Sequence, residues 1–178
     1  KYQSIAAQIG VIRGDAHLAL KHFAEAENNS LEALKIQSKD SGALNGLARI
    51  KIATKDQIGA ADYVNQALEA KQADPNAWFA KGEIARLQGK AEEALPHYDR
   101  AIESAPRFVA PRLARARIII DWGKHLDAEP DILAIRGIDA QNPHAAFLHA
   151  LILALKDKVK EVQAALVATE TIPKDFPA

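Results

Sequence analysis

The chain has 178 residues, of which 48% are hydrophobic, 26% charged and only 6% aromatic, a composition typical of a packed protein rather than a disordered one. Its 23 basic and 23 acidic residues cancel, so no net field directs it toward nucleic acid or a membrane surface. Cysteine is absent, which excludes a disulfide framework, thiolate metal sites and a cysteine nucleophile.

Apolar and small residues at helical spacing, interrupted by turn residues, predict helices in pairs. The first helices of the pairs are expected at about 7–20, 41–54, 75–88, 108–122 and 142–156. The second helices are expected at about 23–37, 57–71, 91–104, 126–138 and 159–170. Gly89 and Gly123 follow first helices and are predicted as left-handed caps. No apolar run approaches the roughly 18 residues of a membrane span.

Pro96 and Pro130 stand about six residues into the third and fourth second helices. Each removes a helical hydrogen bond and is expected to bend its helix. Two interpretations stay open: a tolerated kink on the outer side, or a local change in the curvature of the whole array.

Small residues recur with a period of 34. One series consists of Gly14, Ala48, Gly82, Ala116 and Ala150. A second consists of Ala26, Ala60, Ala94, Ala128 and Val162. Small side chains recur where two helices approach closely, because a branched side chain would block the contact. Tyr98 is therefore predicted as a wedge between the contact points Ala94 and Ala101.

The third repeat resembles the tetratricopeptide repeat (TPR) in residues at matching positions: Trp78, Gly82, Ala94, Tyr98, Ala101 and Pro106. Lys81 and Ala85 depart from the pattern. The resemblance implies an all-α fold, a right-handed superhelix of about five helix pairs. The repeats are expected at about 7–40, 41–74, 75–108, 109–142 and 143–176, in a single array over 1–178 that is a segment of a longer repeat protein.

In a TPR array the first helices line a concave groove. The resemblance thus predicts a partner-binding surface for a protein or extended peptide, formed by Asn45, Arg49, Asn76, Phe79, Glu83, Arg86, Leu113, Arg117 and Phe147, with Gln8, Val11, Asp15 and Leu18 in the first repeat. Aromatic and arginine side chains dominate binding energy at many interfaces. The alternative for Phe79 and Phe147 is packing against an adjacent repeat.

Arginines cluster in the fourth repeat, where Arg112 and Arg115 occupy positions that are usually apolar. One interpretation is an anion site of Arg112, Arg115 and Arg117 for an acidic peptide, an acidic polysaccharide or phosphate. The other is snorkelling beside acidic residues of adjacent helices.

No catalytic constellation is visible in the sequence. Phosphate-binding glycine loops and the motifs of zinc proteases and serine hydrolases are missing, and the histidines stand at unrelated phases. We therefore expect no enzyme site, no cofactor and no metal.

Three segments, 42–56, 77–106 and 142–166, resemble PEP-CTERM/exosortase-associated TPR lipoproteins of bacteria. The resemblance implies a scaffold in an exopolysaccharide export or protein-sorting system, periplasmic or anchored to the outer membrane through its parent protein. Two alternatives are the repeat arm of an enzyme such as a glycosyltransferase, whose catalytic domain lies outside this segment, and a cytoplasmic adaptor or co-chaperone module.

Overall fold

The computed structural model describes residues 2–156, which form helices and short turns without a strand among them. The chain divides into two compact bodies. The N-terminal body comprises Lys1–Ala105 and the C-terminal body Pro106–Ala178. The all-α prediction is confirmed for the described residues, whereas the helix predicted at 159–170 lies outside them.

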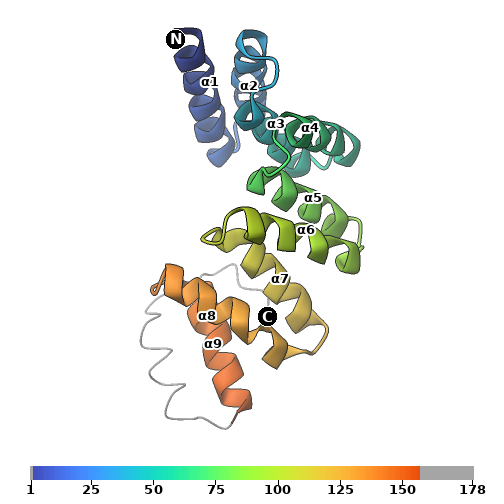
Figure 1. Cartoon of the computed structure of the whole chain (residues 1–178), viewed down its shortest axis with the longest axis vertical. Coiled ribbons are helices and arrows are strands. Elements are labelled where there is room, and N and C mark those ends of the chain that lie inside the picture. Colours follow the sequence, from blue (N-terminus) through green and yellow to red (C-terminus); the bar gives the residue numbers. More distant parts are fainter. Residues whose placement is uncertain (1, 157–178) are drawn as a thin grey trace. The chain divides into compact units, whose positions relative to one another are not determined.

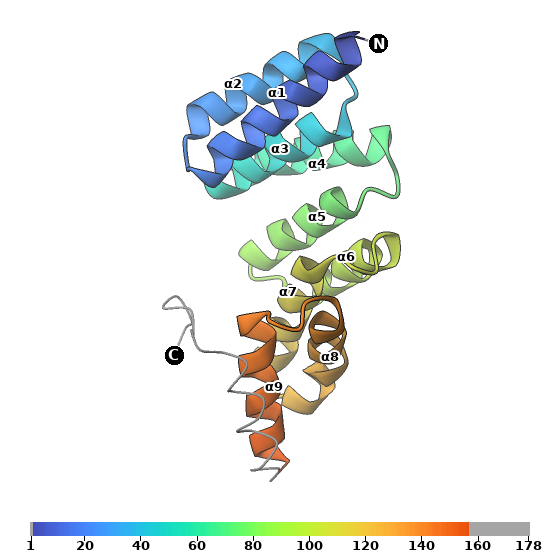
Figure 2. The ribbon, with the colours of Figure 1, turned by 90° about the vertical axis from the view of Figure 1, so that its left-hand side faces the viewer.

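The N-terminal body consists of three helix hairpins: α1 (Tyr2–Ala19) with α2 (Phe23–Ile36), α3 (Ser41–Ala53) with α4 (Gln57–Ala70), and α5 (Pro75–Leu87) with α6 (Ala91–Ser104). Helices of each hairpin lie side by side (Figures 1 and 2), and each second helix also packs on the next first helix. The first helices α1, α3 and α5 contact one another in turn.

The C-terminal body contains α7 (Val109–Asp121), a short 3-10 helix η1 (His125–Ala128), α8 (Glu129–Ile138) and α9 (Pro143–Leu155). Helix α8 packs between α7 and α9. The core here combines small and branched side chains, namely Ala116, Ala128, Ile132, Ile135, Ala145 and Ile152.

The predicted helix boundaries hold to within one or two residues, with two exceptions. Helix α1 begins at Tyr2, five residues before the predicted start at 7. The helix expected at 126–138 is divided into η1 and α8, with Pro130 in the first turn of α8. A proline needs no N–H donor in a first turn, so Pro130 does not bend a helix interior as predicted. Pro96 does stand inside α6, and it is exposed to solvent.

The small-residue series lies at the closest helix contacts. Ala48 packs with Ala60 and Val64 of the same hairpin. In the next hairpin Gly82 lies so close to the buried Tyr98 ring that an added Cβ would be 2.4 Å from its Cε1 atom. Gly82 thus provides the space that the Tyr98 ring occupies, as the wedge prediction requires.

The turn between the helices of each hairpin contains one residue in the left-handed region. Gly89 (φ 75°) and Gly123 (φ 74°) confirm the predicted caps, since glycine adopts positive φ without strain. Lys21 (φ 60°) and Lys55 (φ 64°) occupy the same repeat position without being glycine. All four hairpins of the described residues therefore make the same turn.

Side-chain caps start three of the first helices, α3, α5 and α9, whereas α7 has none. Asp40 accepts the Ala43 N–H at 2.8 Å, and Asn142 accepts the Ala145 N–H at 3.1 Å. Asp74 caps α5 through the Asn76 N–H at 2.9 Å, with Pro75 following directly as the first helical residue. These caps satisfy N–H groups that a helix start leaves free, and they start α3, α5 and α9 at defined residues.

Candidate functional site

One face of α5 holds four of the residues predicted to bind a partner: Asn76, Phe79, Glu83 and Arg86. Their spacing of three, four and three residues puts them on a single stripe of the helix. Asn76 is exposed in the first turn, and the other three are partly exposed. We call these four residues the α5 stripe.

Arg86 is held by its neighbours. Its Nη2 and Nε atoms donate to the two carboxylate oxygens of Glu83 at 2.8 and 3.1 Å. The hydroxyl of the buried Tyr98 donates to the same carboxylate at 2.5 Å. A bidentate pair fixed by a third group orients the guanidinium before any ligand arrives.

The pKa values of Arg86 and Tyr98 both depart from their ordinary values in this network. The hydrogen bond to Glu83 raises the pKa of Arg86 above its ordinary value, so its charge is permanent. Burial, followed by the hydrogen bond to Glu83, raises the pKa of the Tyr98 hydroxyl. Tyr98 therefore stays a hydrogen-bond donor throughout the neutral range.

Phe79 contacts a ring of its own hairpin. Its centroid is 5.9 Å from that of Tyr98, and the planes are tilted by 38°. This geometry is favourable for two aromatic side chains. This contact lies within one repeat, so it differs from the alternative of packing against an adjacent repeat, and Phe79 remains partly exposed.

Asn45 is buried, with only 6% of its surface exposed. Its Nδ2 atom donates to Asp74 at 3.0 Å, and Asp74 in turn caps α5. The Asn45 Oδ1 atom is buried without a hydrogen-bond partner. The structure therefore places Asn45 beneath the surface, where it joins two successive repeats instead of facing a partner.

Arg49 and Asp15 lie on neighbouring first helices. The Nη1 atom of Arg49 donates to Asp15 Oδ1 at 2.8 Å, and both side chains are about half exposed. The two residues are 34 positions apart, one repeat of the sequence. An ion pair thus joins the first helices α1 and α3. Arg49 stands one repeat before Glu83 of the α5 stripe.

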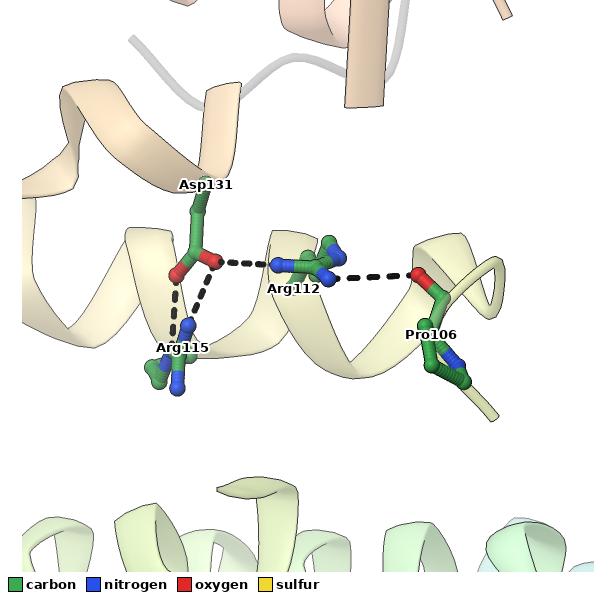
Figure 3. A network of polar contacts seen from close by, with 4 residues as sticks. All are labelled: Pro106, Arg112, Arg115 and Asp131. Atoms are coloured by element: carbon green, nitrogen blue, oxygen red, sulfur yellow. Dashed lines mark hydrogen bonds and ion pairs between the residues drawn. The ribbon is translucent and has the colours of Figure 1, made fainter. Parts of the chain in front are cut away.

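In the C-terminal body, two arginines of α7 bind one aspartate of α8 (Figure 3). Arg115 makes a bidentate pair with Asp131, through Nε at 2.7 Å and Nη2 at 2.6 Å. Arg112 donates to Asp131 Oδ1 at 3.3 Å and to the Pro106 carbonyl at 3.2 Å. Asp131 is only 3% exposed.

This pairing matches the interpretation in which Arg112 and Arg115 snorkel beside an acidic residue of the adjacent helix. Asp131 itself was not identified from the sequence, although an acidic residue directly before the buried Ile132 is the signal that could have found it. Arg117 takes no part in the network and is exposed. The structure thus does not bring the three predicted anion-binding arginines together.

Two further residues of the predicted surface lie in the C-terminal body. Leu113 packs against the core of that body, and Phe147 on α9 is partly exposed. Both are partly exposed, as Phe79, Glu83 and Arg86 are, so their exposure does not rank them below these members of the α5 stripe.

The hairpin fold, its constant turn and the 34-residue spacing of its helix contacts define the class of α-helical repeat proteins. One repeat of the chain, residues 75–108, matches the family model described as tetratricopeptide repeat.

A TPR repeat-containing protein of Methanocaldococcus jannaschii, MJ0941, is 34% identical over 73 residues, which are 41% of this chain and 22% of that protein. The match thus spans less than a quarter of that relative's length.

Two solved structures share the fold. One, from a functional characterization of Pseudomonas aeruginosa pilF, has a TM-score of 0.82 at 16% identity and covers 94% of this chain and 77% of that one. Another, YrrB, is described as a TPR protein with an unusual peptide-binding site. It has a TM-score of 0.59 at 17% identity and covers 87% of this chain and 80% of that one.

Within residues 2–156, no helix has the length and apolar character that crossing a membrane requires. The same residues contain no group of three or more histidine, aspartate or glutamate side chains placed to hold a metal ion.

Proposed function

We propose that the chain is a non-catalytic scaffold that binds an extended segment of a partner protein on the α5 stripe and the neighbouring face of α3. The observation that carries this proposal is the Arg86 guanidinium, fixed by Glu83, on the same helix stripe as the partly exposed Phe79 ring. An aromatic side chain and a preorganised arginine on one rigid helix are the elements that interfaces use as anchors.

The chemistry of the stripe favours one kind of ligand. Phe79 would contact an apolar side chain, and the N–H groups of Arg86 not engaged with Glu83 would bind a carboxylate or a backbone carbonyl. The amide of Asn76 would pair with the ligand backbone, and the exposed Arg49 could exchange Asp15 for a ligand acid. The peptide-binding site of YrrB, which has the same fold, supports a peptide as the class of ligand.

The biological setting follows from the sequence resemblance and is also a proposal. We place the protein in a bacterial exopolysaccharide export or PEP-CTERM sorting system, at the periplasmic side of the envelope. Genes for an exosortase or for polysaccharide export beside its own gene would support this setting. A sugar-nucleotide-binding domain in the same polypeptide would instead favour the arm of a glycosyltransferase.

An acidic polysaccharide is a second candidate ligand, and Arg117 is the residue that favours it. Arg117 is exposed, whereas Arg112 and Arg115 are engaged with Asp131. Reversal of this charge in Arg117→Glu should weaken binding of an acidic polymer such as alginate. Unchanged binding would remove the candidate.

Site-specific photo-crosslinking in cells tests the peptide surface. A photoreactive amino acid at the exposed Asn76 should capture a partner, whereas the same group at the exposed Arg100 on α6 should not. A peptide from the captured region is then titrated against the purified chain. Phe79→Ala and Arg86→Gln should each weaken binding at least about tenfold, with Ile58→Ala as the exposed control.

Equal capture at both positions, or peptide affinities unchanged by both substitutions, would contradict the proposed surface. Circular dichroism of each variant separates loss of binding from loss of fold, since Phe79 and Arg86 both contact the Tyr98 network.

A further inference from the structure

Helix α1 exposes an apolar stripe along its outer side. Tyr2, Ile5, Ile9 and Ile12 are 90, 51, 45 and 67% exposed, and the exposed Ala16 continues the line. We call these five residues the α1 stripe. Such a contiguous apolar surface on a folded body marks an interaction site more often than chance exposure.

The internal repeat shows what this face does elsewhere. Ile9 corresponds to Ala43 on α3 and Ala77 on α5, both fully buried. Ala43 packs with Ala33 of α2, and Ala80, which corresponds to Ile12, packs with Ala60 and Val64 of α4. The same phase on α3 and α5 is therefore the surface that receives a neighbouring helix.

The α1 stripe nevertheless differs from its counterparts in size. Alanine and glycine occupy the positions of Ile9 and Ile12 on α3 and α5, and the isoleucines are far larger, whereas Ala16 corresponds to the larger Ile50 and Ile84. At Gly46, the counterpart of Ile12, even one added Cβ would lie 3.1 Å from Ser30 Oγ on α2. A helix packed as closely as α2 on α3 would collide with Ile9 and Ile12. The stripe fits a helix at a longer distance.

The spacing of the stripe indicates which packing it fits. Steps of three, four, three and four residues from Tyr2 to Ala16 are the a and d positions of a coiled-coil seam, with isoleucine as a preferred side chain. Helix α1 also has 18 residues against 13 in α3 and α5, and its additional first turn carries Tyr2 and Ile5. Residues 2–6 of this extension are exposed, and the extension lengthens the seam.

We infer that α1 pairs antiparallel with α1 of a second copy of this chain. A two-fold axis between residues 9 and 12 would place Ile9 opposite Ile12 of the second copy, and Ile5 opposite Ala16. Arg13 would face the uncharged Gln8, and Asp15 is engaged with Arg49 of its own chain. No like charges meet in this arrangement, and the helix dipoles oppose one another favourably.

The interface would be small, so a dimer with a dissociation constant in the micromolar range is expected. Sedimentation velocity of the full 178-residue chain between about 1 and 300 µM measures it. Ile12→Glu should raise the dissociation constant at least about tenfold, because a carboxylate would be buried in the seam. Ile5→Glu should do the same without touching the hairpin contacts.

Ile58→Glu is the matched control, because Ile58 on α4 is 81% exposed and lies off the stripe. It should leave the dimer intact. Circular dichroism checks the fold of each variant, and Ile5→Glu decides the result if Ile12→Glu is unfolded. A wild-type chain that stays monomeric over the whole range, or a dimer that survives both α1 substitutions, overturns the inference.

The absence of cysteine allows a test of the direction of pairing. An oxidised mixture of the Ile9→Cys and Ile12→Cys variants should form a cross-linked dimer of unlike chains, since their Cβ atoms would face each other. Cross-linking of each variant with itself, at a rate equal to that in the mixture, would exclude the antiparallel register.

Discussion

Arg49 of α3 and Asp15 of α1 form an ion pair of 2.8 Å between residues one repeat apart in the sequence. Equivalent positions of successive repeats therefore contact each other directly across the first helices. Residues separated by one 34-residue period in the sequence are thus in contact in the structure. The pair lies on the face where we propose that a partner binds.

The Arg49–Asp15 pair should contribute little to stability, since both side chains are about half exposed. A double-mutant cycle with Asp15→Asn and Arg49→Gln, followed by urea unfolding, should give a coupling of about 0.2–1 kcal/mol. The coupling should shrink in about 0.5 M NaCl because salt screens exposed charges. A coupling above about 2 kcal/mol would show that the pair is shielded from solvent.

Gly82→Ala should destabilise the protein by about 1–3 kcal/mol, because the new Cβ would be 2.4 Å from the Tyr98 ring. The second repeat has alanine and valine at the two positions, as Ala48 and Val64. Tyr98→Val is itself destabilising because it removes a buried ring, but the cost of Gly82→Ala should be smaller in that background, visible as favourable coupling in thermal unfolding. Gly137→Ala is the control, since nothing lies within 4 Å of its Cβ, and it should be neutral or stabilising.

Asp131→Asn should be far more damaging than an ordinary loss of surface charge. It would leave Arg112 and Arg115 largely buried without their shared carboxylate. Breaking a buried pair in this way costs about 3 kcal/mol or more. The exposed Asp127 nearby in η1 provides the control, and Asp127→Asn should change the free energy of unfolding by less than about 0.5 kcal/mol. Equal effects of the two changes would contradict a structural role for Asp131.

The turn position shared by the hairpins predicts opposite effects of glycine. Lys21→Gly and Lys55→Gly should each stabilise the chain by about 0.5–1 kcal/mol, because glycine tolerates the positive φ without strain. Gly89→Lys should cost a similar amount at the same repeat position. Thermal melts of the three variants check the sign, and destabilisation by both glycine substitutions would show that the lysine side chains make compensating contacts.

His97 predicts a pH dependence of stability. Burial against Trp78, and then the Lys81 charge, lower the pKa of His97 below its ordinary 6.5. The unfolded chain therefore takes up a proton at His97 more readily than the folded chain. The contribution of neutral His97 to the free energy of unfolding is complete above pH 6.5 and is lost as the pH falls. Urea unfolding at pH 7.5 and 5.5 should show a smaller loss for His97→Gln than for the wild type. An unchanged difference would remove His97 as the cause.

The fold could be predicted because its determinants are local. Tight helix contacts require small side chains at a fixed period, and Gly82 with Tyr98 is a pair of that kind. The left-handed conformation at Lys21 and Lys55 could not be predicted from lysine itself, which has no preference for positive φ; only the repeat position shared with Gly89 and Gly123 indicates it.

The candidate site was predictable only in part. The TPR resemblance predicts that Asn45, Phe79 and Leu113 face an open groove, but these side chains are buried or partly buried. Repeat phase states which side of a helix a residue occupies, not how far the adjacent hairpin covers it. The pairing of Arg112 and Arg115 with Asp131 likewise depends on side-chain reach between helices, which spacing along the chain does not contain.

The helices of the N-terminal body pack on those next to them in the chain and on the neighbouring first helix. In the described part of this body α1 does not pack on α6, so a pulling force would detach the hairpins in succession. A scaffold of this kind can lengthen under load and recoil when released. Held between two moving partners, it would act as a mechanical buffer.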